Sequence, residues 1–427
     1  MQRVAGFWRT YWSRGNPGRP TPRSLAVFMN RMWLLALLFK LLGSSWDVSW
    51  HFKWLRDDLA PPHLLNTVGT GIAIGLVLAH TFTGFGADRR SLRIMQIGTG
   101  IFVVAGPIDV INHRINGLDL TAWSPSHLLL YFGTMIMVIG VIRNWYLTYP
   151  RQGRQWSFGL VALFAFLFED FFFPTGQQEY GILEVASWFR GAPYAEPTLL
   201  DFAAGQIGRP VDDIAVQHFA MPIAPWVYPL WGIVICGGVL IAARVTVGLR
   251  WTATVVAGMY VAYRCLIWPL LVVGTFPPSS LPVWLLALGL FVDLAFLLRV
   301  HPYLRAVLGG IVVAAAGYGG LALSALVTGT PLDLAEQHID GWRADFEAGS
   351  SLLTPPVAWW SAWIAVPALV VVWLLIVVAA RRTIGLDTPR PPATPVAYAA
   401  EPPRDARGRL TGEPAEHTDH QPAARAR

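Results

Sequence analysis

Two patterns of aspartate and histidine in the first third of the sequence have the residue types and spacing of metal ligands. In each, an aspartate is followed four residues later by a histidine, and a second histidine comes after a short loop. The two groups are Asp47, His51 and His63, and Asp109, His113 and His127. Residues four apart share one face of a helix, and each closing histidine opens the next apolar segment. Two helix ends should therefore bring each group together.

Two imidazoles and one carboxylate leave coordination positions open, which is typical of a reactive metal centre and not of a closed structural site. An ionised aspartate inside an apolar segment is costly, and a metal ion would supply the partner that it needs. A hydrogen-bonded Asp–His pair beside an interfacial histidine is the alternative that needs no metal. We favour a metal because the pattern occurs twice. The ligand types fit copper, iron or zinc.

The elements that must position these side chains are membrane-spanning helices. The chain has 427 residues, of which 54% are hydrophobic and 14% charged, whereas soluble domains carry about 25% charged residues. Several apolar runs approach the roughly 20 residues that a helix needs to cross a bilayer. We predict an all-α, polytopic transmembrane bundle of about ten spans. The expected spans are 27–50, 62–82, 92–113, 125–147, 156–174, 220–243, 251–273, 281–299, 304–328 and 357–380.

The distribution of arginine predicts how these spans are oriented. Arginines fill the N-terminal arm 1–26 and every second connection, so the positive-inside rule places both termini in the cytoplasm. The opposite connections are acidic, above all 175–219 and 329–356. The tail 383–427 is rich in Pro, Ala and Arg and should be disordered. We expect a multi-pass protein of the inner or plasma membrane, with both Asp/His/His groups toward the extracytoplasmic side.

The spans fall into two parts. Residues 27–147 form a four-span unit in which two hairpins, each with one Asp/His/His group, read as an internal repeat. Residues 148–382 add six further spans. The net charge of +6 follows the topology and forms no basic stripe with interleaved aromatics, so no nucleic-acid partner is expected. The bilayer is the first partner.

The sequence around the first pattern resembles that of a known family. The stretch Asp47-Val48-Ser49-Trp50-His51, then Arg56-Asp57 and Pro62-His63, resembles the copper-site stretch in the C subunit of particulate methane monooxygenase and ammonia monooxygenase. The second pattern, closed by Ser124-Pro125-Ser126-His127, resembles that subunit's second metal site. The resemblance covers about residues 40–135. It implies that both groups bind copper, one or two ions in all.

The chain departs from this family in three respects. It has Asp109 where the family has asparagine, which adds a negative charge to the second site. It has more spans than that subunit, and nothing in it looks like the periplasmic copper-binding domains of the partner subunit. We therefore expect a distant relative with its own substrate.

The resemblance implies a copper-dependent monooxygenase, or a subunit of one, that uses O₂ to oxidise a small apolar or lipid-soluble substrate. Electrons would come from a separate donor, because the chain has no haem, flavin or iron–sulfur signature. Other membrane or extracytoplasmic copper-binding subunits are the further partners that the family implies. Two other functions stay open. One is acquisition, transport or insertion of copper or another metal, and the other is a non-catalytic membrane subunit.

A few further polar residues lie in or beside the spans. Glu169 and Asp170, at the end of the fifth span, could support a metal ligand or act as an extra one, or reach to water. His218, just before the sixth span, could complete a site or lie exposed in a loop. Arg264 and Asp293 lie inside two consecutive spans and could pair with each other across the helices, with a proton path as the alternative.

Overall fold

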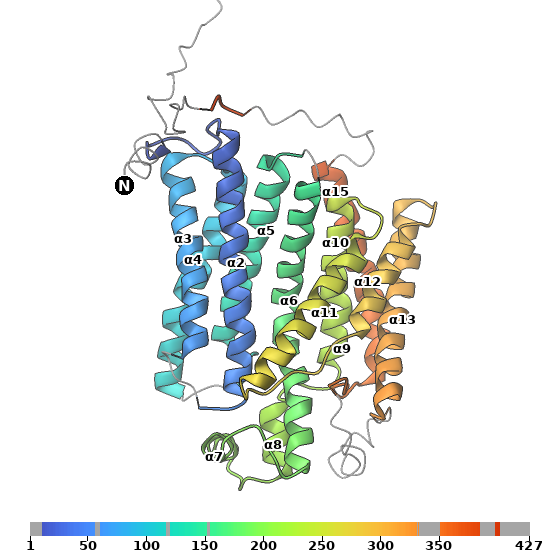
Figure 1. The fold of residues 1–427 in the computed structure, drawn as a ribbon. Helices are drawn as coiled ribbons and strands as arrows, with labels where there is room; N and C mark the ends of the chain where they lie inside the picture. Colours follow the sequence, from blue (N-terminus) through green and yellow to red (C-terminus); the bar gives the residue numbers. More distant parts are fainter. Residues whose placement is uncertain are drawn as a thin grey trace, which may run out of the picture.

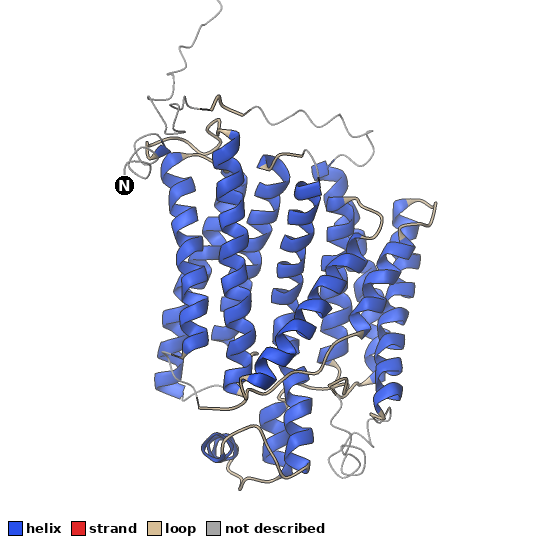
Figure 2. Cartoon of the chain, viewed as in Figure 1, coloured by secondary structure: helices blue, strands red, loops and turns tan. Residues whose placement is uncertain are grey.

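The computed structural model describes residues 11–55, 60–116, 120–151, 154–330, 332, 351–384 and 398–401. Within these ranges all regular structure is helical, apart from an isolated β-bridge between Pro22 and Ala399 (Figure 2). The prediction of an all-α fold is confirmed for this part of the chain.

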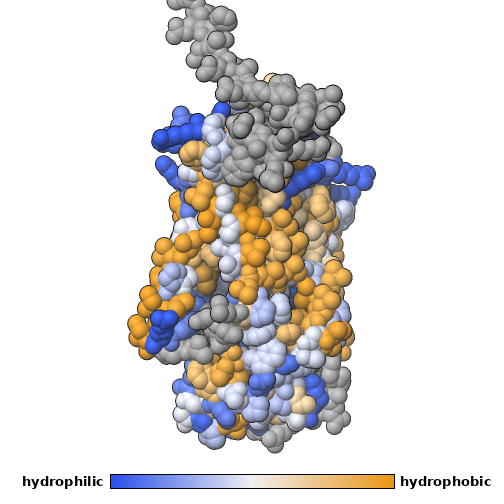
Figure 3. All heavy atoms as spheres, turned by 60° about the vertical axis from the view of Figure 1, so that its left-hand side comes forward, coloured by the Kyte–Doolittle hydropathy of each residue, from blue (hydrophilic) through white to orange (hydrophobic). Residues whose placement is uncertain are grey.

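Nine helical segments of the described chain are long and apolar enough to cross a membrane. They are α2 (Arg23–His51), α3 (Pro61–Thr83), α4 (Arg89–Asn116), α5 (Pro125–Thr148), α6 (Arg154–Phe189), the run of α9 (Val227–Trp231), η1 (Gly232–Cys236) and α10 (Gly237–Val247), α11 (Thr252–Val273), α13 (Pro302–Thr328), and the run of η3 (Trp359–Ser361) and α15 (Ala362–Ile384). Figure 3 shows hydrophobic side chains across the middle of one face and hydrophilic ones toward both ends. These are the properties of a multi-pass membrane protein.

The described residues contain nine such segments, where about ten spans were predicted. The segment expected at 281–299 contains only α12 (Trp284–Ala295), which has 12 residues. Such a helix is about 18 Å long, less than the roughly 30 Å of a bilayer core. The sixth span also differs, since its helix begins at Val227 and not at residue 220.

The first four helices form two hairpins that turn at the same end of the bundle, the lower end in Figure 1. Helix α2 packs along α3, and α4 packs along α5. Glycines let the backbones touch inside each hairpin. A Cβ on Gly69 would lie 2.6 Å from the carbonyl oxygen of Ala36, and one on Gly133 would lie 2.7 Å from the backbone nitrogen of Phe102. Close packing of this kind fixes how the two ends of each hairpin meet.

Helix α6 continues to Phe189, well past the predicted limit at residue 174. Pro174 lies inside it, and the Trp231 indole donates a hydrogen bond to the carbonyl of Phe171, one turn before the proline (2.6 Å). Neighbouring side chains of this kind satisfy a backbone that proline disturbs, so the helix need not end.

The predicted acidic loop 175–219 is therefore mostly helical. Beyond α6 come α7 (Pro197–Gln206) and α8 (Asp213–Ala220), and α8 packs against α6 below the hairpins in Figure 1. Most of the second acidic loop, residues 333–350, lies outside the described residues, as do residues 1–10 of the arm, Arg56 and Asp57, and residues 385–397 and 402–427 of the tail. The cytoplasmic location of the termini and the division into two parts stay predictions.

Candidate metal centres

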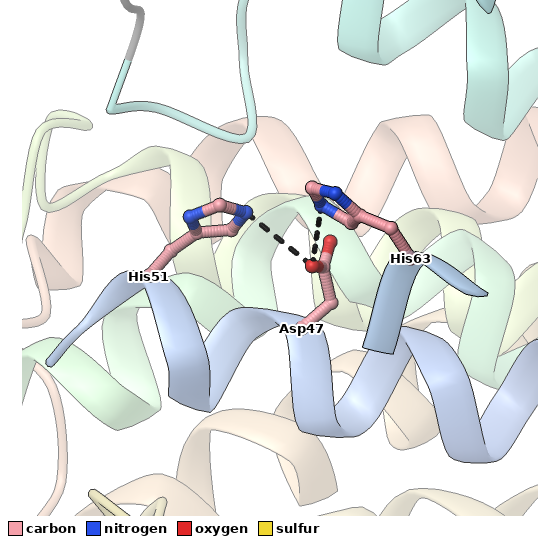
Figure 4. A group of neighbouring side chains, drawn as sticks. All are labelled: Asp47, His51 and His63. Carbon is pink, nitrogen blue, oxygen red and sulfur yellow. Dashed lines mark ion pairs between the residues drawn. The ribbon is translucent and has the colours of Figure 1, made fainter. Parts of the chain in front are cut away.

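The first group lies where α2 ends and α3 begins. Asp47 and His51 lie one turn apart on α2, and His63 is in the first turn of α3, after Pro61 and Pro62. Proline suits this position because the first turn of a helix needs no backbone donor there. The Nε2 atoms of His51 and His63 lie 3.3 and 2.8 Å from the same Asp47 oxygen, Oδ1 (Figure 4).

The second group has the same construction at the junction of α4 and α5. The Nε2 atoms of His113 and His127 both lie 3.4 Å from Oδ1 of Asp109. Ser124 caps α5, and its side chain accepts a hydrogen bond from the backbone N–H of His127 (3.2 Å). Asp109 is buried, whereas Asp47 is partly exposed, so the second group is the more enclosed of the two.

Both groups fit a metal ion. In each, one ligand atom per residue lies within 4.8 Å of the other two, and these are the groups of this kind that the described residues contain. Ligands about 2.0–2.1 Å from a tetrahedral ion lie about 3.3 Å apart. The four carboxylate–imidazole distances, 2.8 to 3.4 Å, are close to that spacing. The sequence therefore predicted the members of both groups, and the structure brings them together.

The tautomer of His127 favours a cation in the second group. Its Nδ1 lies 2.8 Å from the backbone carbonyl of Thr121. A carbonyl only accepts, so Nδ1 must carry the hydrogen. In the neutral ring, Nε2 then presents a lone pair toward the carboxylate of Asp109. Two lone pairs repel unless a proton or a metal ion lies between them. A backbone carbonyl behind a ring nitrogen is also the usual way in which proteins orient a metal-binding histidine.

His80, in contrast to the histidines of the two groups, has neutral partners at both ring nitrogens. Its Nδ1 donates to the carbonyl of Phe85 (2.7 Å), and its Nε2 accepts from the Trp33 indole (3.2 Å). Both nitrogens are satisfied by neutral partners, and the ring is fully buried near the opposite end of α3. His80 is therefore a packing residue.

A cavity of about 210 Å³ reaches the whole first group and one residue of the second. Asp47, His51 and His63 line one part of its wall, and His127 of the second group lines another. Helix α2 also contributes Lys40, seven residues and about 10 Å deeper than Asp47. Lys40 was not among the predicted site residues, although a lone lysine inside an apolar run is a signal of function.

Lys40 is buried and held in place. Its ammonium donates to the side chains of Asn66 (3.1 Å) and Thr70 (3.3 Å), and it lies 3.7 Å from the centre of the Phe102 ring. Asp170 is its acidic neighbour and lines the same cavity. The deep part of the cavity thus carries a fixed cation.

Glu169 and Asp170 both line the cavity, but neither belongs to a metal group. Asp170 interacts with Lys40, and Glu169 interacts with Arg264 and Tyr260 on α11. Both therefore lie beside basic side chains, and whether either supports or binds a metal stays a prediction. His218 is exposed on α8 and belongs to neither group.

The predicted pair of Arg264 and Asp293 is wrong. Arg264 pairs with Glu179 (2.9 Å), and Asp293 pairs with Arg244 (3.1 Å). The error follows from the length of α6. Glu179 was assigned to a solvent-exposed loop, but α6 continues past Pro174 and buries it, where Tyr228 also donates to its carboxylate (3.1 Å).

Fold and site together define a class, a multi-pass helical membrane protein with two Asp/His/His groups that could each hold a metal ion. Comparison of the chain with family models, with curated proteins and with solved structures gave no match. The functional assignment therefore depends on the geometry of the site and on the resemblance of residues 40–135.

Proposed function

We propose that this chain is a membrane metalloprotein that binds copper at its two Asp/His/His groups and uses O₂ to oxidise a small apolar or lipid-soluble substrate. The role resembles that of the C subunit of the methane and ammonia monooxygenases. The observation that carries the proposal is the spacing within the two groups, whose carboxylate–imidazole distances of 2.8 to 3.4 Å match ligands of one ion. At His127, the Thr121 carbonyl leaves Nε2 facing Asp109, where a proton or a metal ion must lie.

The residues of the two groups would hold the metal and orient it toward the shared cavity. Three protein ligands leave positions open for other ligands. Bound copper would supply the binding and reduction of O₂. The overall reaction consumes substrate, O₂, two electrons and two protons, and it releases the hydroxylated product and water. The electrons must come from a separate donor.

The cavity fits a small substrate. Its volume, about 210 Å³, is below the roughly 300–1,000 Å³ of pockets that take drug-sized ligands. Phe102, Tyr131, Phe166 and Phe173 supply apolar wall. Such walls exclude water, which protects a reactive centre from side reactions.

Metal acquisition or transport is the competing function. A route for cations would need ligands that continue inward from Asp47, and the deeper acids of the cavity, Glu169 and Asp170, lie beside the cations Arg264 and Lys40. The next charged group on that face of α2 is Lys40, a cation that would repel a metal ion. His80, farther toward the opposite end, is occupied by Trp33 and Phe85. The monooxygenase-like function is therefore the better supported.

The test uses the purified full-length chain. Copper-loaded protein, supplied with a reductant, should consume O₂, and His51→Ala or His113→Ala should reduce both copper content and O₂ consumption. The same preparations reconstituted in vesicles should not accumulate copper inside. Copper uptake without O₂ consumption would overturn the proposal in favour of transport, and unchanged copper content in both variants would remove the site itself.

A further inference from the structure

A second hollow of about 340 Å³ lies at the opposite end of the bundle from the metal groups, where α2 and α6 begin (top of Figure 1). Helix α2 contributes Arg31 and Leu34 to it, and the start of α6 contributes Arg154 and Phe158. We call this hollow the arginine cleft. Nothing in the proposed function uses it.

The rim of the arginine cleft is basic. Arg31 and Arg154 are exposed and come from different helices. Arg31 donates a long hydrogen bond (3.5 Å) to the side-chain carbonyl of Gln155, which is neutral. None of the described residues that line the cleft is acidic, and neither arginine forms an ion pair with a described residue. Two guanidinium groups thus lack a counter-charge within the described protein.

The floor of the cleft is apolar and closely packed. Phe158 is 65% exposed, whereas Trp145 is buried. The Trp145 ring stacks on Tyr149 with centroids 4.1 Å apart, and the Tyr149 hydroxyl donates to Gln155 (3.1 Å). Gly159 makes room for this stack, because any Cβ there would collide with the Trp145 ring.

We propose that the arginine cleft binds an anionic phospholipid of the surrounding leaflet. The headgroup phosphate would lie between Arg31 and Arg154, since guanidinium groups bind phosphate oxygens in pairs of hydrogen bonds. An acyl chain would run over Leu34 and Phe158. A basic rim above an apolar floor, at the end of membrane-spanning helices, matches this amphipathic molecule better than it matches a free anion.

Binding to the delipidated full-length protein in neutral detergent tests the proposal. Native mass spectrometry would follow titration with phosphatidylglycerol, phosphatidylcholine or inorganic phosphate. Phosphatidylglycerol should bind more tightly than phosphatidylcholine. The double variant Arg31→Gln, Arg154→Gln should weaken it about twenty-five-fold, a factor of about five for each arginine near an anionic headgroup. Phe158→Ala should weaken the binding of phosphatidylglycerol but not the binding of inorganic phosphate.

The matched control is the double variant Arg90→Gln, Arg93→Gln. Both arginines are exposed near the start of α4, and neither lines the cleft, so this variant should bind phosphatidylglycerol as the wild type does. The single variant Arg154→Gln is the test if the double variant does not fold, because Arg154 has no ion-pair partner among the described residues. Equal binding of the two lipids, an unchanged affinity in the cleft variants, or displacement of the lipid by inorganic phosphate at similar concentration would each overturn the proposal.

Discussion

Lys40 and Asp47 lie on one face of α2, about two turns apart, and both line the same cavity. The first metal group therefore lies at one end of this cavity, and the buried ammonium of Lys40 lies deeper in it. This order of charges lets a metal ion bind beside Asp47 but opposes its movement inward. It also means that a substrate in the cavity would contact an ammonium group and an apolar wall, with Asp170 nearby.

Removing one histidine from each group should remove one metal ion at a time. We expect His51→Ala to lose about one equivalent of bound copper and His113→Ala the other, since each ligand is one of three. The double variant should bind almost none. Metal analysis of purified protein measures this. His218→Ala is the matched control, because that histidine is exposed and belongs to neither group; if it lost as much metal as the others, a third ligand set would be involved.

The charge of Asp109 should set the affinity of the second group. Asp109→Asn keeps an oxygen ligand but removes the negative charge, so the copper affinity of this group should fall by about tenfold or more. Titration against a chelator, in the His51→Ala background that isolates the second group, measures the change. An unchanged affinity would mean that Asp109 does not contact the metal.

Much of this arrangement could be predicted from the sequence because it is local. An aspartate and a histidine four residues apart share a helix face. A short turn then restricts the closing histidine to positions near the end of the first helix. Both groups assembled as that reasoning predicted. The apolar runs likewise predicted most of the spans, because length and hydropathy decide membrane insertion.

The predictions that were wrong concern features that depend on contacts between distant segments. Pro174 and the polar residues after it read as the end of a span, but Trp231 supports the backbone there and α6 continues. The partner of Arg264 then changes from Asp293 to Glu179. No local pattern reveals which indole reaches which carbonyl, so these pairings appear only in the packed structure.

The Arg264–Glu179 pair should behave as a unit. Both side chains are buried, so removing one leaves an uncompensated charge. Arg264→Met or Glu179→Gln alone should cost about 3–5 kcal/mol of unfolding free energy. The double variant should cost much less than the sum of the two. Thermal or denaturant unfolding in detergent of the wild type, the two single variants and the double variant gives a double-mutant cycle. Simple additivity of the free-energy changes would show that the two groups do not interact.

Asp88 should make stability depend on pH at the end of the bundle opposite the metal groups. Burial opposes its ionisation, but hydrogen bonds from Arg143 (2.6 Å) and Ser91 outweigh this and hold the pKa of Asp88 below its usual value. A depressed pKa contributes stability above the unfolded value of about 3.9, and this is lost as the pH falls through the folded pKa.

The contribution of Asp88 should be below about 1 kcal/mol, because the pair is partly exposed and screened. Wild type should therefore have a slightly higher Tm than Asp88→Asn at pH 6, and the gap should close toward pH 3. A gap that stays constant over this range would mean that Asp88 acts through packing and not through its charge.

The close approach of α4 and α5 should control the second metal group. A Cβ on Gly133 would lie 2.7 Å from the backbone nitrogen of Phe102 and force the two helices apart. Gly133→Ala should therefore cost about 1–3 kcal/mol of unfolding free energy. Because His113 and His127 come from these two helices, the same variant should also lose copper from the second group while the first keeps its own.

Gly106→Ala is a matched control for this effect. Gly106 lies three residues before Asp109 on α4, whereas Gly133 lies six residues after His127 on α5. A Cβ on Gly106 nevertheless meets nothing within 4 Å. Its substitution should leave the metal content unchanged and should shift stability by no more than about 0.5 kcal/mol. If Gly106→Ala removed the metal and Gly133→Ala did not, the spacing of the two helices would not be what brings His113 and His127 to the carboxylate of Asp109.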